Sequence, residues 1–74
     1  MQINEGDLLV LTSSGQRKLV EVVVPADELA GVRRVDGHGN AFSALVADLR
    51  QPMPADLDRH KPALAEWMLR KGAP

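Results

Sequence analysis

The sequence predicts a small α+β domain that is mainly β: an antiparallel barrel or curled sheet with a C-terminal helix. Two apolar runs near the N-terminus, Leu8–Leu11 and the valine-rich Leu19–Val24, are separated by a polar spacer that contains Gly15. β-branched residues such as valine fit a pleated sheet better than a helix, and glycine among small polar residues marks a turn. The last twenty residues instead space their apolar side chains as a helix does.

The first hairpin is predicted from these two runs, with residues 12–18 as the connecting turn. Side chains alternate between the two faces of a strand. We therefore expect Val20, Val22 and Val24 to point into the core. Glu21 lies on the other face. This face is otherwise apolar, so we expect it to be half covered.

A single helical turn is predicted for Pro25–Ala30, and Gly31 is expected to end it. Proline is tolerated at the first position of a helix, and the acidic residues Asp27 and Glu28 suit a helix N-terminus. The functional alternative for this segment is an acidic loop that recruits a basic partner.

A second hairpin is predicted from Val32–Val35 and Ala41–Arg50, with Asp36–Asn40 as the loop at its tip. The second of these strands carries apolar residues on both faces. We therefore expect a bend or bulge near Ala44–Leu45, which would let a small sheet curl.

The C-terminal region is predicted as a proline-rich linker over residues 52–54 and a helix within residues 55–74, following a sheet domain over residues 1–51. Pro62 suits the first turn of a helix that runs to about Lys71. We expect this helix to pack on the same domain and to cap an open end of its core. The alternative is a helix held away from the sheet for a partner.

Composition limits the kinds of function that the chain can have. The 74 residues carry a net charge of −1, contain no cysteine and include only two aromatic residues, Phe42 and Trp67. Disulfides and thiolate metal sites are thereby excluded, and a base-stacking platform is disfavoured. No apolar run approaches the roughly 18 residues of a membrane helix. We expect a cytoplasmic protein that does not contact membranes, with homodimerisation as one way to bury more surface.

No residue pattern indicates catalysis or a bound metal. His38 lies in the glycine-rich loop, where a hairpin tip is the better interpretation than an acid–base group or a phosphate cradle. Ser13 and Ser14 are typical turn residues, and Asp56–His60 is typical of a charged helix start. We therefore expect no enzyme activity, no cofactor and no metal.

Two segments carry a resemblance to a known family. Residues 5–11 (EGDLLVL) and residues 31–36 (GVRRVD) resemble SH3-like small β-barrels, most closely the KOW type of transcription elongation and ribosomal proteins. The resemblance implies a five-strand barrel that binds partners through its loops, without catalysis, within the machinery of gene expression.

The leading functional hypothesis is a small non-enzymatic regulator that binds a protein and docks on a larger assembly. The transcription machinery, RNA polymerase or an associated factor, is the first candidate partner, and a phage or a mobile element is one source of such a protein. Contact would use an exposed sheet edge or the terminal helix. The residues expected to bind the partner are Arg33, Arg34, Trp67 and Met68.

The alternative hypothesis is an SH3-like module that binds nucleic acid. A near-zero net charge counts against it, because phosphate neutralisation supplies most of the affinity in such proteins. Its contact residues would be Arg17, Lys18, Arg33, Arg34 and Arg50.

Overall fold

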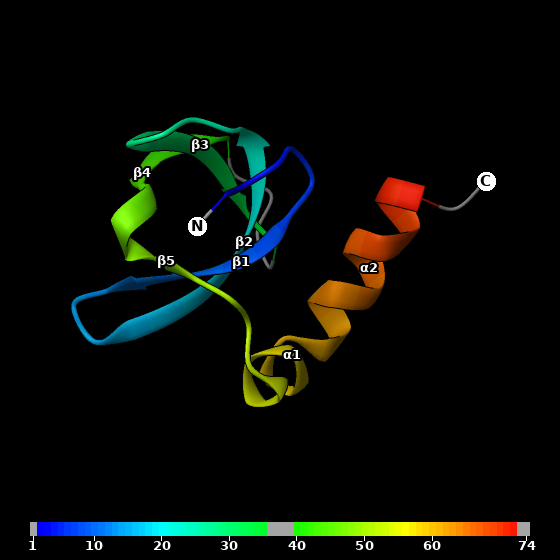
Figure 1. Cartoon of the computed structure of the whole chain (residues 1–74). Helices are drawn as coiled ribbons and strands as arrows, with labels where there is room; N and C mark the ends of the chain where they lie inside the picture. Colours follow the sequence, from blue (N-terminus) through cyan, green and yellow to red (C-terminus); the bar gives the residue numbers. More distant parts are fainter. Residues whose placement is uncertain (1, 36–39, 73–74) are drawn as a thin grey trace.

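Five antiparallel strands form one curled sheet in the computed structural model, which describes residues 2–35 and 40–72 (Figure 1). The strands follow the order β4-β3-β2-β1-β5, so β4 and β5 are the two edges within these residues. The predicted fold class, a mainly β curled sheet with a C-terminal helix, is confirmed. The strands are β1 Leu8–Ser13, β2 Gln16–Val24, β3 Leu29–Arg34, β4 Phe42–Leu45 and β5 Leu49–Arg50.

The first hairpin is tighter than the sequence predicted. β1 and β2 pair from Leu8 opposite Glu21 as far as Ser13 opposite Gln16. The turn is therefore only Ser14 and Gly15, with φ angles of 52° and 76°. Two residues with positive φ match the right-handed twist of the flanking strands. The polar residues predicted as spacer mostly extend the strands, because backbone pairing does not require apolar side chains.

The main core fills the concave face of the sheet. Its buried members come from all five strands and from the N-terminal segment: Ile3, Leu9, Val20, Val22, Ala30, Val32, Ala44 and Leu49. Val20 and Val22 are completely buried, as predicted, but the prediction for Val24 was wrong, because its side chain is 59% exposed. The pairing of β2 with β3 shifts register between Val22 and Val24. Such a bulge breaks the alternation of faces.

A second apolar cluster covers the outer face of the same strands. Val10 and Leu19 are each next in sequence to a residue of the main core and therefore point to the opposite side. They pack with Val35 and with the side chains of Leu64 and Trp67 from the C-terminal helix. β1 and β2 are thus covered on both faces, which explains why both faces of their sequences are apolar. The helix lies on this outer face and not over the open end of the sheet.

Residues 25–30 do not form the predicted helical turn. Residues 25–28 are irregular, and β3 begins at Leu29, so that Gly31 lies within the strand, opposite Val24 on one side and Ser43 on the other. A Cβ atom at Gly31 would lie 3.2 Å from the Cβ of Val24, so the absence of a side chain allows this close approach. Pairing on both sides of β3 outweighs the local helical signals.

The strand predicted for Ala41–Arg50 is two short strands. β4 ends at Leu45, a 3₁₀ turn η1 covers Val46–Asp48, and β5 follows on the far side of the sheet, paired with β1. The hydroxyl of Thr12 donates a 2.9 Å hydrogen bond to the carbonyl oxygen of Asp48, which holds η1 against β1. The chain therefore breaks one residue after the predicted bend. The predicted hairpin tip, residues 36–39, lies outside the described residues.

The C-terminal region forms two helices, α1 Pro54–Arg59 and α2 Lys61–Gly72 (Figure 1). Pro54 is the first residue of α1 although the sequence placed it in the linker. Pro62 lies in the first turn of α2, as predicted, where its missing N–H costs no helical hydrogen bond. Neither helix has the length and apolar character that crossing a membrane requires.

Candidate functional site

A bidentate ion pair fixes the helices to the sheet. The Arg17 guanidinium on β2 donates from Nε to Asp56 Oδ1 at 2.9 Å and from a terminal nitrogen to Asp56 Oδ2 at 2.8 Å. The backbone N–H of Met53 also donates to Oδ2, at 2.8 Å. These hydrogen bonds, that from Arg17 first, hold the pKa of Asp56 well below its usual value, and the same contact raises the pKa of Arg17. α1 therefore joins the sheet at one defined point.

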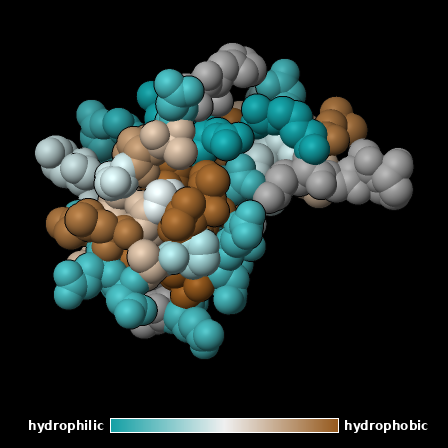
Figure 2. Space-filling model, turned by 90° about the horizontal axis from the view of Figure 1, so that it is seen from above, coloured by the Kyte–Doolittle hydropathy of each residue, from teal (hydrophilic) through white to brown (hydrophobic). Residues whose placement is uncertain are grey.

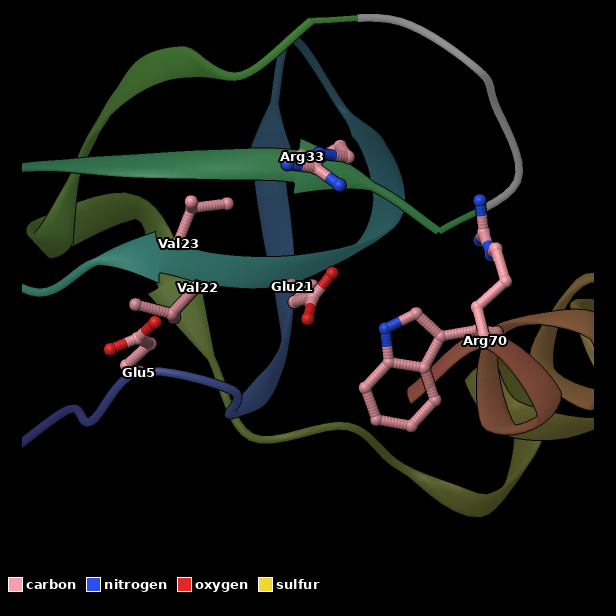
Figure 3. A pocket seen from close by; sticks show the side chains of 7 residues that line it. Glu5, Glu21, Val22, Val23, Arg33 and Arg70 are labelled. Carbon is pink, nitrogen blue, oxygen red and sulfur yellow. The ribbon is translucent and has the colours of Figure 1, made fainter. Parts of the chain in front are cut away.

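A pocket of about 280 Å³ lies between α2 and the outer face of the sheet (Figure 3). Arg33 and Glu21 enter it from neighbouring strands, directly opposite each other in the register. Trp67 and Arg70 enter it from α2. Two of the predicted partner-binding residues, Arg33 and Trp67, therefore meet here. Glu21 is buried as the floor, which is more than the half cover that the sequence predicted.

The other two predicted partner-binding residues lie elsewhere. Arg34 is opposite Val20 in the register, so it starts from the other face of the sheet. The Met68 side chain is 59% exposed and lies outside the helix–sheet contact. Trp67, by contrast, is half-buried against the outer cluster. Its position gives it a packing role in the chain itself.

The charges of this helix–sheet pocket balance each other. Glu5 and Glu21 supply two carboxylates, and Arg33 and Arg70 supply two guanidinium groups. A pocket with equal numbers of opposite charges has no net preference for an anion or a cation. This pocket is therefore a weaker candidate for a binding site than the groove beside β4.

The second site is a groove beside β4, with a volume of about 410 Å³. Its apolar lining includes Leu11 from β1, Leu29 from β3, and Phe42 and Leu45 from β4. In Figure 2 the apolar surface gathers on the left, the side on which β4 lies in Figure 1. Phe42, Leu45 and Leu29 are 39%, 51% and 58% exposed, so these side chains remain available to a ligand.

The edge strand next to this groove lacks the residue types that usually oppose pairing. β4 reads Phe-Ser-Ala-Leu, without a charge or a proline. Among the described residues it pairs with β3 alone, which leaves the backbone groups of its other side facing outward. Edge strands usually carry charges, prolines or bulges that prevent such pairing. A binding site at β4 would therefore explain why this edge is free and apolar.

No pattern in the sequence predicts this groove directly. In the sequence, Phe42, Ala44 and Val46 alternate with Leu45, Ala47 and Leu49, a pattern that predicts apolar groups on both faces of a bent strand and not a groove. Leu29 was placed in a helical turn, but the register puts it directly opposite Leu45.

The residues of the nucleic-acid alternative lie on several surfaces. Arg17 is engaged by Asp56, and Lys18 lines the β4 groove. The Arg50 guanidinium donates to the carbonyl oxygens of Ala47 and Leu49, at 2.6 Å and 3.0 Å. Arg33 lies in the helix–sheet pocket. These basic side chains therefore do not form one continuous surface.

The residues considered for chemistry have structural roles or fall outside the described part of the chain. Asp56 and His60 belong to the start and the C-terminal cap of α1, and the His60 N–H donates to the Asp56 carbonyl oxygen at 3.3 Å. Within residues 2–35 and 40–72, no group of three or more His, Cys, Asp or Glu side chains is placed to hold a metal ion. His38 is not among the described residues.

Comparisons of the chain with known protein families, with curated proteins and with solved structures found no match.

Proposed function

We propose that this chain is a non-enzymatic protein-binding module that docks on a larger assembly through β4. The observation that carries the proposal is the free edge of Phe42–Leu45 beside an apolar groove. An extended segment of a partner can add to such an edge as a further strand. The partner's backbone then satisfies the outward-facing N–H and C=O groups, and its alternate side chains enter the groove.

The lining of the groove suits this mode of binding. Residues two apart in a strand point to the same side, so one set of alternate partner side chains would lie beside Phe42 and the other set beside Leu29 and Leu45. The exposed apolar surfaces of Leu29 and Leu45 lie opposite each other across β3 and β4 and would be removed from water. Each Å² of apolar surface so buried contributes about 25 cal/mol.

The proposed setting is transcription, with RNA polymerase or an associated factor as the partner. The support is the resemblance of residues 5–11 and 31–36 to KOW-like members of the SH3-like barrels. The five strands of the curled sheet agree with the architecture that this resemblance implies. A regulator of this kind acts by occupying a surface, so it needs no catalytic group.

An affinity capture with a matched pair of variants tests the proposal. The edge variant combines Ser43→Lys and Leu45→Lys, which place two charges on exposed positions of β4. The control combines Ala65→Lys and Leu69→Lys, which make almost the same chemical change on exposed positions of α2. Each tagged chain is incubated with a nuclease-treated bacterial lysate at moderate salt.

We expect one stoichiometric protein to be retained by the wild type and by the control, and to be lost from the edge variant. Circular dichroism should show the same strand signal for all three chains. A partner that the edge variant retains in full would show that β4 is not the contact. A partner that the wild type retains from an untreated lysate but not from the nuclease-treated one would favour the nucleic-acid alternative.

A further inference from the structure

We propose that β4 pairs with β4 of a second copy of the chain, in an antiparallel two-fold dimer that covers the docking edge. The pairing is carried by the geometry and composition of β4 and stands independently of any other partner. Its consequence, that the dimer must open before β4 can dock on an assembly, rests on the proposed function.

The outward-facing backbone groups of β4 belong to two of its four residues. Val46 and Glu28 continue the β3–β4 register, and the Val46 N–H donates to the Glu28 carbonyl oxygen at 2.8 Å. In an antiparallel ladder, hydrogen-bonded pairs alternate with pairs that are not hydrogen-bonded. Ala44 therefore bonds to β3, whereas the N–H and C=O groups of Ser43 and Leu45 point away from the sheet.

A two-fold axis at Ala44 would use all of these groups. Antiparallel pairing about this axis sets Ser43 of each copy opposite Leu45 of the other. Both pairs are then of the hydrogen-bonded type, so every outward N–H and C=O of these two residues finds a partner. An axis at Ser43 would instead set Leu45 opposite Ala41, which lies outside β4.

The composition of the edge favours a copy of itself as the occupant. Two-fold symmetry sets the same surface patch of each copy against the other, so a charged edge strand repels its own copy. Residues 40–47 contain no charge and no proline, the residue types that usually prevent edge-to-edge pairing. The whole chain carries a net charge of only −1, which adds little repulsion between copies.

The dimer would also cover apolar surface on the outer face of the sheet. Leu29 and Leu45 lie opposite each other there, and both are exposed. Val24 is exposed on the same face, because it lies against the position that a Cβ atom of Gly31 would take. Across the axis, the two Leu45 residues are diagonal neighbours, a separation that long side chains can bridge. The pairing therefore joins two apolar patches into one.

Sedimentation equilibrium over a range of protein concentrations tests the pairing. We expect the wild type to pass from monomer to dimer as the concentration rises. The edge variant Ser43→Lys, Leu45→Lys places like charges opposite each other and should weaken the dimer about tenfold or more. The control Ala65→Lys, Leu69→Lys should dimerise as the wild type does. A monomeric wild type, or an edge variant that dimerises equally well, would overturn the inference.

Single cysteines test the register, since the natural chain contains none. A mixture of Ser43→Cys and Leu45→Cys chains should form a disulfide-linked heterodimer on mild oxidation faster than either chain links to itself. The reason is that residues directly opposite each other have the closest Cβ atoms. Ser13→Cys, at an exposed position of the first hairpin, replaces Ser43→Cys in the control. Equal linkage of Leu45→Cys to both chains would contradict pairing at β4.

Capture from the lysate separates this inference from the proposed function. The disulfide-linked dimer should retain less of the captured protein than the same chains after reduction, and equal retention would overturn the regulatory consequence. If the wild type is monomeric but the edge variant loses the captured protein, self-pairing fails and docking at β4 stands. If the edge variant is monomeric and still retains that protein, docking at β4 fails and self-pairing stands.

Discussion

Arg17 and Asp56, 39 residues apart in the sequence, form a bidentate ion pair that joins β2 to α1. The Asp56 carboxylate has a second role, because it also accepts the backbone N–H of Met53 at the start of the helix. One side chain thus caps α1 and attaches it to the sheet. Since α2 follows α1 after a single residue, this contact also helps to set how α2 lies on the outer face.

Asp56→Asn should loosen the docking of the helices. The amide keeps the size of the side chain but loses the charge that Arg17 binds. We expect a lower midpoint of thermal unfolding and a red shift of the fluorescence of Trp67, the single tryptophan, as it becomes more exposed to water. Asp58→Asn, on an exposed position of the same helix, is the control and should change neither quantity.

The double variant Arg17→Met, Asp56→Asn tests whether the two residues act as one unit. Since both single changes break the same contact, the double variant should lose less free energy of unfolding than the two single variants lose together. Additive losses in the free energy of unfolding, measured by urea denaturation, would show that Asp56 acts mainly as a helix cap.

The same carboxylate predicts a dependence of stability on pH. The pKa of Asp56 is lower in the folded chain than in the unfolded chain, so ionisation of this group stabilises the folded state. The contribution is complete above the ordinary aspartate pKa of about 4 and is lost as the pH falls below that value. The stability gap between wild type and Asp56→Asn should therefore be widest near pH 6 and should narrow towards pH 3. If the difference in stability did not change over this range, the pKa of Asp56 would not be lowered in the folded chain.

The strands that could be predicted from sequence are those whose local pattern and long-range pairing agree. Leu8–Leu11 and Leu19–Val24 are apolar, β-branched in the second case, and joined by a turn with glycine, so pattern and pairing indicate the same hairpin. The segment at Pro25–Ala30 carries helical signals that the structure overrides. Its last two residues pair with β4, and a local pattern contains no information about such a distant partner.

The candidate site was harder to predict for the same reason. That β4 is an edge strand follows from the order of all five strands, and the groove follows from side chains of β1, β2, β3 and β4 together. The sequence neighbours of Arg17 suggest only a possible contact with nucleic acid, and those of Asp56 only a charged helix start. The sequence contains no pattern that pairs them.

The two faces of the first hairpin should be equally sensitive to truncation. Leu9 points to the main core and Leu19 to the outer cluster, and each is only 1% exposed. Leu9→Ala and Leu19→Ala should each lower the free energy of unfolding by about 2 to 5 kcal/mol. Leu69→Ala, on the exposed side of α2, is the control and should cost less than about 0.5 kcal/mol. A small effect of Leu19→Ala would mean that α2 does not cover the outer face in solution.

The turn of the first hairpin should tolerate asparagine better than alanine at Gly15. The residue has a φ angle of 76°, and a Cβ atom there would have no neighbour within 4 Å, so the cost of a side chain comes from the backbone. Alanine in this left-handed region costs about 1 kcal/mol, whereas asparagine adopts it more readily. Urea denaturation should therefore rank the free energies of unfolding as wild type, then Gly15→Asn, then Gly15→Ala. If Gly15→Ala were as stable as the wild type, this turn could not have the conformation described.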